Sequence, residues 1–96
     1  MTAFNVVRFQ IKPGLDAEFL EAHNAGKAAW PGLKTAAIIK TGEAAYCLIG
    51  EWADMDAIAK ARAGMIATLD SFRHVLEPTA LGATDAVSGP MVLSLT

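Results

Sequence analysis

Within the segment FNVVRFQI of residues 4–11, hydrophobic and polar positions alternate from Val7 to Ile11. Successive side chains of a strand point to opposite faces, so every second residue shares a face. The residues that share one face are Asn5, Val7, Phe9 and Ile11. The pattern predicts a strand from Phe4 to Ile11, which the turn residues Lys12-Pro13-Gly14 end.

Apolar residues then repeat at spacings of three and four, which places them on one stripe of a helix. The stripe consists of Leu15, Phe19, Ala22, Gly26 and Ala29. It predicts a helix from Leu15 to Trp30, with Asp16 and Glu18 in its first turn, where the helix dipole favours acids. Pro31-Gly32 ends this helix, because proline cannot continue it.

Two apolar segments follow, Leu33 to Lys40 and Ala45 to Trp52. The short turn Thr41-Gly42-Glu43 between them predicts a β-hairpin. Asp54 is a suitable N-cap for a second helix from Asp54 to Ala63. Gly64 then predicts a kink or a break.

The helical pattern resumes from Met65 to Leu76, and Pro78 ends it. We expect a glycine-containing loop from Leu81 to Pro90 and a short last strand from Met91 to Leu95. The order strand, helix, strand, strand, helix, strand predicts one α+β domain over residues 1–96. This is a ferredoxin-like sandwich, with a four-stranded antiparallel sheet and both helices on one face, because crossovers are right-handed.

The predicted strands are apolar on both faces, as Ala36 and Ile38 alternate with Ala37 and Ile39. An antiparallel sheet with one face in water alternates more cleanly. The sequence therefore predicts a homodimer that packs sheet to sheet. The alternative is a mildly apolar open face.

Composition excludes several classes of protein. The 96 residues are 53% hydrophobic and 19% charged with a net charge of −2, which fits a folded domain and gives no basic run for nucleic acid. The single cysteine, Cys47, excludes a disulfide framework within one chain. The N-terminus has no signal-peptide pattern and no apolar run reaches membrane-spanning length, so we expect a cytoplasmic protein that binds no membrane.

Several local features together resemble a known family. Lys12-Pro13-Gly14 precedes a helix that carries Phe19 and Ala22-His23. Pro31-Gly32-Leu33 enters the second strand, and Gly50-Glu51-Trp52 ends the third. Over nearly its whole length the chain resembles the antibiotic biosynthesis monooxygenase domain of the dimeric α/β-barrel superfamily.

The resemblance implies a homodimer whose two sheets close into a barrel, with a pocket between the helices and the sheet of each subunit. It also implies oxidation of aromatic polyketides or quinols without a cofactor. A haem-degrading branch uses an Asn, a Trp and a His. Asn5 and His74 match its positions poorly and the expected Trp falls near Ala61, so haem degradation is not carried over.

Two histidines are candidates for proton transfer. His23 lies four residues after Phe19, at the border of the apolar stripe. His74 lies four residues after Asp70, which is a spacing that lets the carboxylate orient the imidazole. The alternatives are a structural hydrogen bond for His23 and a surface ion pair for His74. No metal-ligand spacing is visible, so we expect no metal.

Substrate binding is assigned to four residues. Tyr46, Trp52 and Phe72 are candidates for lining an apolar pocket, and Asn5 for bonding a ligand oxygen. Trp30 is a further candidate for the pocket wall. Core packing is the alternative for the aromatic residues. Arg8, in the middle of a strand, needs a partner if a dimer buries it, and Glu51 is a candidate.

Two functions remain open. The first is a small cofactor-independent monooxygenase that acts on an aromatic or quinol-type molecule, with His23 or His74 as the base. The second is a non-catalytic homodimeric binding or interaction module. An open pocket with an inward imidazole favours the first, and two solvent-facing histidines with a filled interior favour the second.

Overall fold

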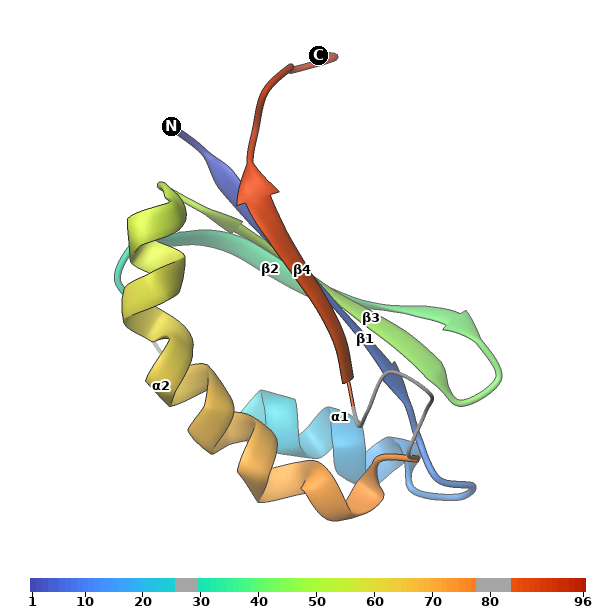
Figure 1. Ribbon diagram of the computed structural model, residues 1–96. Helices are drawn as coiled ribbons and strands as arrows, with labels where there is room; N and C mark the ends of the chain where they lie inside the picture. Colours follow the sequence, from blue (N-terminus) through green and yellow to red (C-terminus); the bar gives the residue numbers. More distant parts are fainter. Residues whose placement is uncertain (26–29, 78–83) are drawn as a thin grey trace.

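The computed structural model describes residues 1–25, 30–77 and 84–96. Its strands form one antiparallel sheet in the order β2-β3-β1-β4. Both long helices lie on the same side of this sheet (Figure 1). The predicted ferredoxin-like architecture is confirmed. The elements are β1 (Ala3–Gln10), α1 (Asp16–Ala25), β2 (Leu33–Gly42), β3 (Ala45–Trp52), α2 (Met55–Phe72), the short 3-10 helix η1 (Arg73–Val75) and β4 (Thr84–Pro90).

Most predicted boundaries of the first three strands and the starts of both helices agree with the structure within two residues. The second helix, predicted to reach Leu76, ends at Phe72 and is followed by η1. The third strand is found as predicted, and Asp54 caps α2 by accepting a 2.8 Å hydrogen bond from the backbone N–H of Ala57. The first helix was predicted to reach Trp30. Trp30 lies outside any helix, and the predicted stripe positions Gly26 and Ala29 lie outside the described residues.

The break predicted at Gly64 is wrong, since α2 runs through it without interruption. The glycine has another role, which is to let a ring approach the helix. A Cβ atom at residue 64 would lie 2.6 Å from Cζ3 of Trp30, well inside van der Waals contact. Gly64 therefore makes room for the Trp30 indole against α2.

The last strand was predicted in the wrong place. Residues 84–90 form β4, which pairs with β1 from Phe9↔Thr84 to Ala3↔Pro90. An edge strand pairs on one side, so it needs few apolar residues and tolerates a proline at its end. The predicted strand Met91–Leu95 lies beyond the ladder as an extended tail that projects past the end of β4 (Figure 1).

The core between helices and sheet consists of two separate clusters of buried side chains. One contains Phe9, Ile11, Phe19, Tyr46, Phe72, Val75 and Leu76. The other contains Ala3, Trp52, Ile58 and Ala61. Between them, one row of residues crosses the sheet, because Ala36 pairs with Gly50, Gly50 with Asn5, and Asn5 with Ser88. These residues are small or of moderate size, so the middle of the interior is left unfilled.

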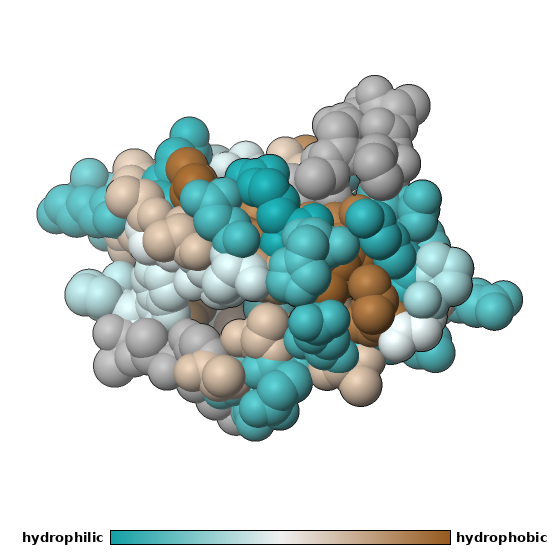
Figure 2. Space-filling view, turned by 90° about the horizontal axis from the view of Figure 1, so that it is seen from below, coloured by the Kyte–Doolittle hydropathy of each residue, from teal (hydrophilic) through white to brown (hydrophobic). Residues whose placement is uncertain are grey.

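The opposite face of the sheet carries no helix in the described part of the chain. Val6, Ile49 and Val87 lie side by side on it, and the last is 63% exposed. Arg8 does not pair with Glu51 as predicted. It faces Asp85 on β4 at 3.9 Å, while Glu51 accepts a hydrogen bond from Thr35. Seen from below the view of Figure 1, the surface is largely hydrophilic, with smaller apolar patches exposed between the hydrophilic side chains (Figure 2).

The tail after β4 is anchored by one backbone hydrogen bond, in which the Met91 N–H donates to the Thr2 carbonyl at 2.7 Å. Beyond it, Val92, Leu93 and Leu95 are 91%, 71% and 89% exposed. Neither long helix in residues 16–25 or 55–72 combines the length and apolar character that crossing a membrane requires.

Candidate functional site

A cavity of about 720 Å³ opens between the helices and the sheet. Its floor is the row of Ala36, Gly50, Asn5 and Ser88. Phe9 and Phe72 of the first core cluster line this cavity, and so do Trp52 and Ile58 of the second. A volume of this size suits a small organic ligand, and walls of aromatic and aliphatic side chains suit an aromatic one.

Asn5 is the polar residue at the centre of this floor, with 7% of its surface exposed. Its Oδ1 accepts a 2.8 Å hydrogen bond from Nε1–H of Trp52. An indole N–H can only donate, so this bond fixes which end of the Asn5 amide is the oxygen. None of the described residues accepts a hydrogen bond from the Asn5 NH₂ group, which leaves it as the donor that Asn5 offers to a ligand.

Gly50 makes the pairing of Asn5 and Trp52 possible. A Cβ atom at residue 50 would collide with Oδ1 of Asn5 and would lie 2.9 Å from Nε1 of Trp52. Any larger residue here therefore forces the two hydrogen-bonding atoms to move apart. Because Gly50 has no side chain, it also leaves the space above this part of the floor open.

His23 lies on α1 and lines the same cavity. Its Nδ1 is 3.0 Å from the carbonyl oxygen of Phe19. A carbonyl only accepts, so Nδ1 carries the proton and donates it. In the neutral ring, Nε2 is then the unprotonated nitrogen, with its lone pair available to accept a proton.

Three aromatic rings surround the His23 imidazole. The ring centroids of Phe72, Phe19 and Phe9 lie 4.5, 4.7 and 5.8 Å from that of His23. Burial among them lowers the pKa of His23 below its ordinary value, and the hydrogen bond to Phe19 opposes this only in part. His23 is therefore neutral at pH 7, which is the state a general base requires.

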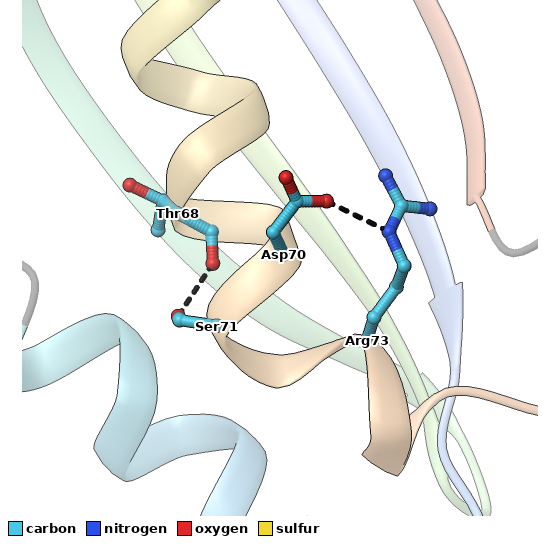
Figure 3. A network of polar contacts seen from close by, with 4 residues as sticks. All are labelled: Thr68, Asp70, Ser71 and Arg73. Carbon is cyan, nitrogen blue, oxygen red and sulfur yellow. Dashed lines mark hydrogen bonds and ion pairs between the residues drawn. The ribbon is translucent and has the colours of Figure 1, made fainter.

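The other candidate catalytic residues lie elsewhere. His74 is on the surface, and its Nε2 is 3.1 Å from the Glu18 carboxylate. Asp70 does not orient His74. It accepts a 2.9 Å hydrogen bond from Arg73, next to the bond from Ser71 to the Thr68 carbonyl (Figure 3).

Of the four residues assigned to substrate binding, the structure brings Asn5, Trp52 and Phe72 to the cavity. Tyr46 is instead packed in the first core cluster, where its hydroxyl donates a 2.7 Å hydrogen bond to Asp16. Within residues 1–25, 30–77 and 84–96, no three His, Cys, Asp or Glu side chains are grouped so that they could hold a metal ion.

Sequence reasoning did not assign a role at the site to Gly50, Ser88 or Arg62, whereas it named Trp30 as a candidate for the pocket wall. Trp30 and Arg62 line the cavity from the segment before β2 and from α2. The spacing of Arg62 from Ile58 and Ile66, four residues each way, was a usable signal that the three share a helix face. Gly50 and Ser88 had no local signal, because their position depends on strand register.

Comparisons with known proteins support this architecture. No protein-family model matches the sequence, and no curated protein matches it either. Solved structures do match. SnoaB from Streptomyces nogalater, which is described as a cofactor-independent oxygenase, has a TM-score of 0.76 at 22% identity, covering 98% of this chain and 96% of its own.

Two further structures cover similar lengths. Rv0793 from Mycobacterium tuberculosis has a TM-score of 0.80 at 10% identity, with both chains covered completely. A candidate antibiotic biosynthesis monooxygenase from Nitrosomonas europaea has a TM-score of 0.78 at 13% identity, covering 95% of this chain and 90% of its own. The chain shares its fold with these structures. The resemblance found in the sequence is thus confirmed at the level of the fold, and this fold supports many functions in principle.

Proposed function

We propose that this protein is a cofactor-independent monooxygenase that acts on a phenolic or quinol-type aromatic molecule. The observation that carries the proposal is the cavity with a neutral His23 in its wall, whose tautomer is set by Phe19. Support also comes from the fold shared with SnoaB, which is described as a cofactor-independent oxygenase.

The reaction needs dioxygen, a base, and a hydrogen-bond donor that stabilises the anion. Nε2 of His23 takes the proton from the phenol, and the NH₂ group of Asn5 donates a hydrogen bond to the resulting oxyanion. The anion gives one electron to dioxygen, and the radical and superoxide combine at a ring carbon to form a peroxide anion. The protonated His23 returns its proton to this peroxide, which regenerates the base. Loss of water leaves a quinone, so that one oxygen atom enters the product and the other leaves as water.

The apolar walls contribute to both halves of this reaction. They hold the rings of the substrate by burial of apolar surface, and they exclude water that would otherwise solvate the anion. A hydrogen bond to an anion inside such a cavity is stronger than the same bond in water. Trp52 acts indirectly, because it holds the Asn5 amide in the orientation that presents its NH₂ group.

Oxygen uptake with a panel of phenols and quinols tests the proposal. Wild type is compared with His23→Gln, and His74→Gln serves as the matched control because it removes a surface histidine. We expect His23→Gln to lower the rate by roughly 100-fold or more and His74→Gln to leave it unchanged. Equal rates in His23→Gln and wild type would refute the role of His23. Tight binding of the panel without any uptake would favour the non-catalytic binding module.

We also propose that two copies pair through the uncovered sheet face. Val6, Ile49 and Val87 form an apolar centre on it, and Arg8 and Asp85 lie beside them on the same face. A face that carries one charge of each sign is complementary to itself across a two-fold axis. The exposed tail residues Val92, Leu93 and Leu95 supply further apolar surface for a partner.

A further inference from the structure

The formal charge on the described cavity wall is of one sign. Among the described residues that line it, Arg62 carries a formal charge, and none is Asp or Glu. His23 adds no charge at pH 7, because burial lowers its pKa. The wall therefore has a net positive charge, although the protein as a whole has a net charge of −2.

Arg62 also differs from the other arginines of the chain in its partners. Arg8 faces Asp85 at 3.9 Å and Arg73 binds Asp70 at 2.9 Å. Within the part of the chain that the structure describes, no carboxylate lies within 4 Å of Arg62. Its planar group with five N–H donors is therefore free to bind an anionic oxygen.

The position of Arg62 places this group at the cavity. Ile58 lies one turn before it on α2 and Ile66 one turn after it, and both line the same cavity. Arg62 is exposed while Ile58 is buried, so the guanidinium lies on the solvent side of the apolar wall. A ligand whose rings fill the cavity can then extend a charged group outward to Arg62.

We propose that the ligand of this cavity is an aromatic carboxylate, whose rings lie between the helices and the sheet and whose carboxylate pairs with Arg62. The inference rests on the proposed function in placing the ligand in this cavity, and it adds the chemical class of that ligand. An arginine binds a carboxylate through two parallel hydrogen bonds, which fixes orientation as well as affinity. Arg62 is then a specificity-determining residue, separate from the proton transfer at His23.

Binding of two matched probes tests the inference without any turnover. The probes are 2-naphthoate and its neutral analogue 2-(hydroxymethyl)naphthalene, titrated by calorimetry and by quenching of tryptophan fluorescence, since Trp30 and Trp52 line the cavity. We expect wild type to bind the carboxylate about tenfold more tightly than the alcohol. Raising the salt to about 0.5 M narrows this preference, because salt screens a partly exposed ion pair.

Two variants of α2 complete the experiment. Arg62→Gln is expected to lose the preference while binding the alcohol as wild type does. Lys60→Gln, which removes a positive charge two residues away that is paired with Asp56, is the control and retains the preference.

Three results would overturn the inference: equal affinity of wild type for both probes, a preference that survives in Arg62→Gln, or no binding of either probe. Oxygen uptake is a separate measurement. A protein that prefers the carboxylate through Arg62 but consumes no oxygen upholds this inference and defeats the oxygenase proposal.

Discussion

The side chains of Trp52 and Asn5 are joined by a 2.8 Å hydrogen bond inside the domain, from a residue at the end of β3 to one in the middle of β1. The bond satisfies the indole N–H, and it gives a polar side chain in an apolar floor a single orientation. Because a side chain at Gly50 would contact both partners, three residues on adjacent strands form one unit.

Trp52→Phe removes the indole N–H and leaves Oδ1 of Asn5 without its partner. We expect the free energy of unfolding to fall by about 1–3 kcal/mol, because a buried acceptor then loses its hydrogen bond. Urea denaturation measures this. Trp30→Phe is the control, since no described residue accepts a hydrogen bond from Trp30. A loss of stability no greater than that of Trp30→Phe would show that the Asn5 bond contributes little.

Gly50→Ala is expected to displace Asn5 or Trp52, because the added methyl group occupies the space of their hydrogen bond. The change destabilises the fold by about 1–3 kcal/mol, as overpacking in a core does. Gly42→Ala is the matched control, since a Cβ there lies at an ordinary 3.7 Å from Ala45. Thermal unfolding of both variants decides, and equal melting temperatures would contradict the packing argument.

The stability of the protein is expected to depend on pH through His23. Its pKa in the folded state is lowered by burial, whereas in the unfolded state it returns to the ordinary value of 6.5. Below that value the unfolded chain binds a proton that the folded chain does not, so the contribution is complete above pH 6.5 and is lost as the pH falls toward the folded pKa. Urea midpoints at several pH values measure this. His23→Gln should flatten the dependence in this window relative to His74→Gln, and parallel curves for the two variants would contradict it.

Association through the sheet face is tested by Val87→Asp, which places a charge within the apolar patch, at its most exposed member. We expect wild type to sediment as a dimer and this variant as a monomer, because an unpaired charge buried at an interface is strongly unfavourable. Met55→Asp makes the same change at an exposed residue at the start of α2, and it should remain dimeric. A monomeric wild type at micromolar concentration would refute the proposed pairing.

The sequence predicted the fold well where local patterns dominate. The alternation in β1, the hairpin of β2 and β3, and the cap at Asp54 all depend on neighbouring residues, and each was found. β4 was misplaced because the apolar run Met91–Leu95 has a strand-like composition, whereas an edge strand is selected by pairing with β1. Gly64 was read as a break because the sequence does not show that a distant ring packs on it.

The site, too, was predicted only where it depends on local patterns. Helical spacing from Phe19 placed His23 beside the apolar stripe, and the structure has it in the cavity wall. The equivalent argument for His74 and Asp70 used spacing alone, and it could not foresee that Glu18 and Arg73 lie closer to them. The floor row needed the strand register, which short-range patterns do not fix.

The row of residues that forms the cavity floor offers positions at which the ligand preference of the domain can be redesigned. Its central members, Asn5 and Gly50, are locked together with Trp52, so changing them disturbs the fold. Its outer members, Ala36 on β2 and Ser88 on β4, lie on edge strands and have exposed side chains. Substituting these two is therefore a route to a shallower or deeper binding chamber, and to a different range of accepted molecules, with the proton-accepting histidine left untouched.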